Sequence, residues 1–158
     1  MKINKLIVLA FAVCIFAINS YADSDKDAQI HAMLLEMDKA IENKDAETIA
    51  KYLDDNIHIV MKVTMGGNDQ VFQFSKDDYL KTMEDGWAVT EEYTYTRDKV
   101  NIEYIGGGNK AVITASVYEL SVVAGRPMAA LSHEKILVEF RDSKPVIINL
   151  TANTNVRM

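Results

Sequence analysis

The spacing of apolar side chains predicts two helices and then a hairpin in the first half of the chain. Apolar residues recur at steps of three and four between Ile30 and Ile41, which indicates a helix with one apolar face. Asn43, Lys44 and Asp45 interrupt this pattern, and Asp45 is suited to cap a second, short helix. From Asn56 the period changes to two, as in a strand, and the turn residues at 66–68 lead into a return strand.

A third helix and a run of long strands follow. Ser75 is suited to cap a helix that ends near Trp87. Four strands are then predicted over 90–105, 110–123, 128–141 and 146–156, the first of them bent near Arg97. Their short connections make them antiparallel neighbours. The order of elements predicts an α+β domain with helices on one face of a curved sheet.

The first 22 residues have the pattern of a cleavable signal peptide. Lys2 and Lys5 precede an uncharged, mostly apolar run over 6–18, and small residues at Ser20 and Ala22 precede a cut before Asp23. The apolar run is too short for a membrane anchor, which needs roughly 20 residues. The sequence therefore predicts an exported, periplasmic or secreted protein with one domain over 23–158 and no membrane attachment after cleavage.

The net charge limits the possible partners of the protein, and the cysteine content shows how the exported domain is stabilised. Loss of Lys2 and Lys5 with the signal takes the formal charge from −6 to −8. An acidic surface argues against nucleic acid or anionic lipid as a partner. The single cysteine, Cys14, lies within the predicted signal, so the exported domain holds no disulfide and depends on its apolar core.

The element order and three short stretches resemble the nuclear transport factor 2-like superfamily. These stretches are 40–46 at the break between the first two helices, 52–55 with its paired acids, and 75–80 at the entry to the third helix. The resemblance implies a cone, in which a curved antiparallel sheet wraps around three helices and leaves a pocket at the open end. Ketosteroid isomerases, polyketide cyclases and non-catalytic binding proteins share this fold, so the fold alone does not choose a function.

Two acids are expected in the pocket. A two-residue turn at Gly125-Arg126 would place Glu119 opposite Ser132 and Val117 opposite Glu134. The face that carries these residues is the more apolar one, so we assign it to the helix side, where Glu119 and Glu134 become diagonal neighbours. Mutual repulsion and burial would raise at least one pKa, which makes Glu134 a candidate for proton transfer and both acids candidates for ligand binding. The alternative is that both acids are solvated near the mouth of the cone.

Five further residues are site candidates. Val60 and Met37 align with the base and tyrosine positions of the ketosteroid isomerases, so that reaction is not expected, but both remain candidates for the pocket lining. His58 is a candidate acid or base near the mouth, or a plain surface histidine. Trp87 is expected to line the pocket or the core. Asn153 points inward or outward, because the preceding loop leaves the last strand's register open by one residue. No motif for a metal or a cofactor is found.

Three functions fit the sequence. The preferred one is an exported protein that binds a small, largely apolar ligand in its cone without catalysis. The second is an isomerase, cyclase or hydrolase that uses Glu134 and His58 for proton transfer. The third is an interaction module that forms a homodimer through the outer face of its sheet, where apolar side chains alternate at Tyr118, Leu120, Leu131 and Leu137.

Overall fold

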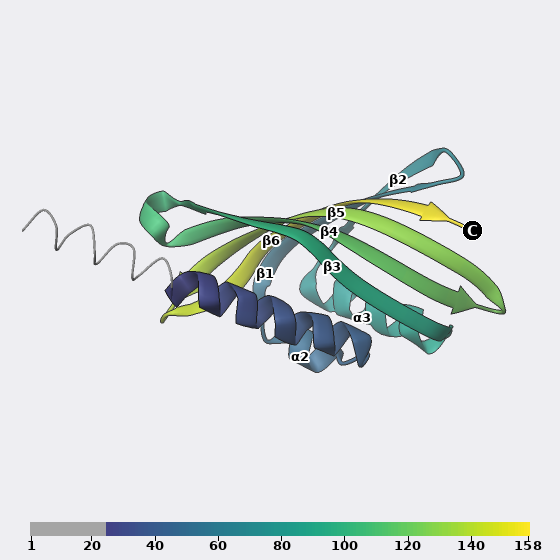
Figure 1. Cartoon of the computed structure of the whole chain (residues 1–158), viewed down its shortest axis with the longest axis horizontal. Helices are drawn as coiled ribbons and strands as arrows, with labels where there is room; N and C mark the ends of the chain where they lie inside the picture. The colour runs from purple at the N-terminus through teal and green to yellow at the C-terminus, as the bar shows by residue number, and fades with distance from the viewer. Residues whose placement is uncertain (1–24) are drawn as a thin grey trace, which may run out of the picture.

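The computed structural model describes residues 25–158, and the predicted signal peptide lies outside this range. A long first helix over 25–42 is followed by the short α2 (Ala46–Ala50), and α3 (Lys76–Ala88) comes after the first two strands. All three helices lie on one side of a curved sheet (Figure 1). None of the helices within 25–158 has the length and apolarity needed to cross a membrane.

Six strands form a single sheet in the order β2-β1-β6-β5-β4-β3. Four of the pairings are antiparallel, and β1 pairs with β6 in parallel. The predicted α+β class, with helices on one side of a curved sheet, is confirmed, although the sheet is not antiparallel throughout. The strands are β1 (Leu53–Met65), β2 (Asn68–Phe74), β3 (Thr90–Ile105), β4 (Lys110–Val123), β5 (Arg126–Arg141) and β6 (Lys144–Arg157).

Side chains cap the starts of α2 and α3 as predicted. The Asp45 carboxylate accepts a hydrogen bond from the Thr48 amide at 3.0 Å, at the start of α2. The Ser75 hydroxyl accepts one from the Asp78 amide at 3.2 Å, at the start of α3. Each cap satisfies a backbone donor that the first turn of a helix leaves free.

A bulge in β3 produces the bend that the sequence predicts. The pairing of β3 with β4 shifts between Asp98 and Asn101, and Lys99 lies there at a φ of 53°. An extra residue in one strand bends it and increases its twist. The bulge lets the strand curve around the helices directly after Arg97, which points to the helix side.

The helix-facing side of the sheet is the one assigned from the sequence. The inward residues of β4 and β5 are buried at their apolar positions, whereas Tyr118, Leu120 and Leu131 on the opposite side are exposed. The inward positions meet the apolar stripe of the first helix. The largest side chains that are fully buried in this core are Ile30, Met33, Ile49, Ile59, Ile113, Ile147, Val117 and Val138.

The predicted register of the β4–β5 hairpin is wrong by two residues. The turn is formed by Ala124 and Gly125, at φ angles of 49° and 71°, and Val123 pairs with Arg126. Two positive φ angles match the twist of a two-residue hairpin, and Gly supplies one without strain. A shift of two residues leaves each side chain on its predicted face, but it moves every partner along the strand.

The last strand's open register is set by two features that its sequence does not show. Asp142 and Ser143 form a two-residue turn in which Arg141 pairs with Lys144. A bulge next to Leu137 then adds one residue to β6. Together they turn the even-numbered side chains of the distal part of β6 toward the helices, so that Ala152 and Thr154 are buried.

Candidate functional site

A cavity of about 370 Å³ lies between the inner face of the sheet and the helices. Its walls are mostly apolar, and they come from the first helix, α2, α3 and all six strands. Four residues predicted to line a pocket are in its lining: Met37, Trp87, Glu119 and Glu134. The volume lies within the usual range for small-molecule sites, about 300–1,000 Å³.

Three other predicted site residues do not line the cavity. His58 and Val60 alternate in β1 with Ile57, Ile59 and Met61, which point inward, so they fall on the opposite face of the sheet. His58 is exposed and therefore not positioned for acid–base chemistry in the cavity. Asn153 is exposed opposite His133 on the outer face, because the bulge in β6 fixes the register in that sense.

A buried arginine forms the centre of the polar groups in the cavity. Arg97 donates from Nε to Asp38 Oδ1 at 2.9 Å and from Nη1 to Glu134 Oε2 at 2.6 Å. Its third hydrogen bond runs from Nη2 to the Tyr95 hydroxyl at 2.6 Å. Only 5% of the Arg97 side chain is exposed. Burial works against its charge, but Glu134, Tyr95 and Asp38 hold the pKa of Arg97 above its usual value.

Glu119 lies in a different environment from Glu134. The two acids are four residues apart in the true register, because Glu119 pairs with Ala130 and Glu134 with Ala115. The Tyr93 hydroxyl donates a hydrogen bond to Glu119 Oε1. Burial raises the pKa of Glu119, the Tyr93 hydrogen bond opposes this rise, and the charge of Glu134 adds to it.

Three tyrosines surround these acids, and the sequence alone assigned none of them a role. Burial, followed by the charge of a nearby glutamate, raises the pKa of Tyr79, Tyr93 and Tyr95 well above the usual value. Their hydroxyls therefore stay protonated: the Tyr93 hydroxyl donates to Glu119, and the Tyr95 hydroxyl accepts from Arg97. The alternation of Tyr93, Tyr95 and Arg97 along β3 was a signal that could have placed all three on one face.

The arrangement favours Glu119 over Glu134 for proton transfer. Glu134 is paired with a buried cation, whereas Glu119 has a raised pKa and, among residues 25–158, one polar partner. A carboxyl whose pKa is shifted toward neutral by burial is suited to give or accept a proton. Within the same range, no group of three or more His, Cys, Asp or Glu side chains is arranged to hold a metal ion.

The chain resembles known proteins in its structure but not in its sequence. No family model matches the sequence, and no curated protein matches it. A proposed scytalone dehydratase from Novosphingobium aromaticivorans aligns with a TM-score of 0.71 at 11% identity, over 87% of this chain and 90% of that one. The hexachlorocyclohexane dehydrochlorinase LinA type 3 from Novosphingobium barchaimii aligns with a TM-score of 0.67 at 12% identity, over 85% and 90%.

A third similar structure is described by the name of its fold. An NTF2-like protein from Cytophaga hutchinsonii aligns with a TM-score of 0.61 at 13% identity, over 78% of this chain and 93% of that one. Identities this low show a shared fold and carry no activity from one protein to another. The chain thus has the nuclear transport factor 2-like fold and bears the cavity typical of that architecture.

Proposed function

We propose that this protein is an exported small-molecule-binding protein that holds a largely apolar ligand in the cavity beneath its sheet. The observation that carries the proposal is the cavity itself, about 370 Å³ in volume, with apolar walls and a few polar groups gathered around Arg97. Such a combination provides both burial energy and orientation for a ligand. Export is proposed from the signal pattern in residues 1–22.

Native mass spectrometry of protein purified from an exporting cell is the direct test. It would reveal the N-terminus of the exported chain and any molecule retained in the cavity. We expect a chain that begins near Asp23 and carries one bound small molecule per chain. An empty protein that also ignores every apolar probe would contradict the binding proposal.

A pair of variants on β4 can show that binding takes place in the cavity. Ser121 lines the cavity, so Ser121→Phe fills it, whereas the next residue, Val122, alternates to the outer face and serves as the control in Val122→Phe. Trp87 is the only tryptophan and lines the same cavity, so its fluorescence reports binding. Ligand binding should be lost in Ser121→Phe and kept in Val122→Phe. Equal binding by both variants would place the ligand elsewhere.

A catalytic role is the second candidate. Two of the structural neighbours are named as a dehydratase and a dehydrochlorinase, and Glu119 has the raised pKa that proton transfer requires. Glu119 therefore replaces Glu134 as the proposed acid or base. Turnover of a bound compound that disappears in Glu119→Gln, with binding retained, would favour the enzyme over the binding protein.

A homodimer through the outer face of the sheet remains a proposal. It is supported by the exposure there of Tyr118, Leu120 and Leu131, at 48%, 43% and 43%. Neighbouring apolar side chains of this kind are often covered by a partner. Light scattering of the purified protein gives the subunit number, and a monomer at all concentrations would exclude this partner.

A further inference from the structure

The charges around the cavity do not balance. Three of the described residues that line it are charged: Arg97, Glu119 and Glu134. Arg97 also bonds Asp38, which lies just behind it on the first helix. The cavity and its immediate support therefore carry three carboxyl groups against one guanidinium group.

Arg97 is poorly suited to receive an anionic ligand, because two carboxylates already balance its positive charge. Each of its three nitrogens already donates to a neighbour, namely Asp38, Glu134 and the Tyr95 hydroxyl. A ligand carboxylate that reached the two remaining N–H groups would lie close to Asp38 and Glu134, and repulsion from these two carboxylates opposes its binding. The positive charge of Arg97 is already balanced by two acids of the protein itself.

Glu119 is the group that remains available. Glu119 lines the cavity, and its Oε1 atom accepts a hydrogen bond from the Tyr93 hydroxyl. The Oε2 atom of Glu119 has no hydrogen-bond partner within residues 25–158. A carboxylate in such a place attracts a positive charge more strongly than it would in water, because the surroundings have a low dielectric constant.

Aromatic rings occur on the same walls. Trp87 and Tyr79 come from α3, and Tyr93 comes from β3, next to Glu119. The faces of such rings attract ammonium groups, and tryptophan attracts them most strongly. The Tyr79 hydroxyl, which has no hydrogen-bond partner among the described residues, provides a further polar contact in the cavity.

We propose that the cavity selects a hydrophobic amine, with its ammonium group at Glu119 Oε2 and its apolar part against Met37, Ile41 and Met83. This assignment of a ligand class rests on the proposed binding function. Carboxylic acids of the same size meet a surplus of negative charge and are rejected. Neutral molecules of the same size bind through burial alone.

Three probes of matched size and differing charge test the proposal: 4-phenylbutylamine, 4-phenylbutan-1-ol and 4-phenylbutanoic acid. Each is titrated into the protein at pH 7.5 while Trp87 fluorescence is followed. We expect the amine to bind about tenfold more tightly than the alcohol, since one ion pair in a partly buried site contributes on that order, and the acid to bind most weakly. An alcohol that binds as tightly as the amine, or an acid that binds best, would overturn the assignment while leaving the binding function intact. Failure of all three to bind would count against the binding function itself.

Glu119→Gln separates the charge from the shape of the site. Gln has nearly the same size and keeps an oxygen that accepts from Tyr93, so alcohol binding should be unchanged and shows that the cavity is intact. Amine affinity should fall about tenfold, to the level of the alcohol. Glu103→Gln removes an exposed acid on β3 and serves as the matched control, with the amine preference retained. The same loss in both variants would mean that the preference comes from the overall charge of the protein.

Discussion

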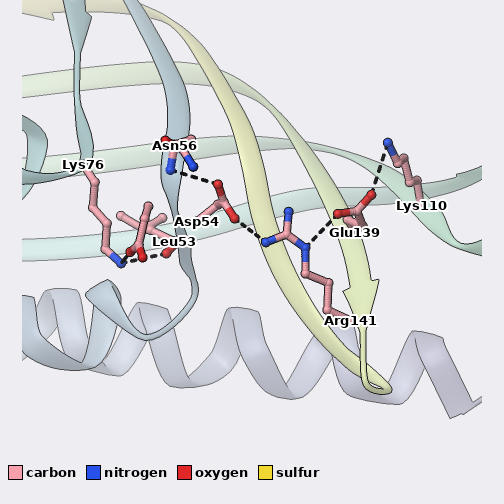
Figure 2. A network of polar contacts seen from close by, with 8 residues as sticks. Leu53, Asp54, Asn56, Lys76, Lys110, Glu139 and Arg141 are labelled. Atoms are coloured by element: carbon pink, nitrogen blue, oxygen red, sulfur yellow. Dashed lines mark hydrogen bonds and ion pairs between the residues drawn. The ribbon is translucent and has the colours of Figure 1, made fainter.

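Two arginine-centred networks occur within residues 25–158, and they differ in how far the arginine is buried. Arg141 bonds Asp54 and Glu139 at the base of β1 and the β5–β6 turn, and Figure 2 shows these contacts together with Lys110. Nearly half of the Arg141 side chain is exposed, at 48%, against 5% for Arg97 in the cavity. Each arginine has two acidic partners, but only Arg97 is itself shielded from water.

The difference shows how burial changes the role of an ion pair. The Arg141 hydrogen bond, followed by the Asn56 amide, lowers the pKa of Asp54, and Arg141 and Lys110 lower that of Glu139. These acids are paired with cations, and they tie the β5–β6 turn to β1. In the cavity, Glu119 has no ion-pair partner among the described residues, because Arg97 pairs with Asp38 and Glu134, and burial raises the pKa of Glu119. The Arg141 network is structural, whereas the cavity that holds Arg97 also contains an acid, Glu119, that is available for chemistry.

Removal of Arg97 should have the largest effect. Arg97→Met keeps much of the side chain's volume but leaves Asp38 and Glu134 without their cation. Breaking a buried pair in this way costs about 3–5 kcal/mol of unfolding free energy. Urea denaturation at pH 7 measures this loss.

Arg141→Met is the matched change in the exposed network. Solvent and salt screen its pairs, so the urea midpoint should move little and by much less than in Arg97→Met. Equal losses of stability in the two variants would contradict the distinction between the networks.

Glu119→Gln should have a smaller effect, and of opposite sign. The folded-state pKa of Glu119 lies above its ordinary value of 4.5, so folding takes up a proton between the two values. The wild-type protein therefore loses stability as the pH rises through that window, whereas the Gln variant does not. The variant should unfold at a higher urea concentration than the wild type at pH 7.5 and at the same concentration near pH 4 or below. A variant that is less stable than the wild type at pH 7.5 would contradict the conclusion that the negative charge of Glu119 has no compensating cation.

The regular part of the fold could be predicted from local pattern. Thr90–Ile105 and Lys110–Val123 are strands at the predicted bounds, because alternation and glycine-rich turns are local signals. The hairpin register was missed because Ala124, a residue without a special preference for positive φ, forms half of the turn. A one-residue bulge in β6 determines on which face of the sheet Asn153 lies, and no local sequence pattern marks this bulge.

The site could be predicted only in part, because local alternation gives the face of a side chain but not its partner. Glu119 and Glu134 were placed on the right face because a register error of two residues preserves the alternation. Their partners were missed: Arg97 reaches Asp38 and Glu134 across 59 and 37 residues of sequence. Such pairings depend on the strand order and on the bulge at Lys99, which lie beyond the reach of periodicity.

The most direct test of the available carboxylate is its own titration. Carbon-13 NMR of the side-chain carboxyl, assigned by its absence in Glu119→Gln, follows the pKa of Glu119 with and without 4-phenylbutylamine. The ionisable groups that interact with it are Tyr79 on α3, Tyr93 on β3 and Glu134 on β5, and Glu134 is itself paired with Arg97. We expect a pKa above 4.5 in the free protein that falls when the amine is bound, since a nearby cation favours the charged form. A pKa at or below 4.5, or one that the amine leaves unchanged, would contradict the account.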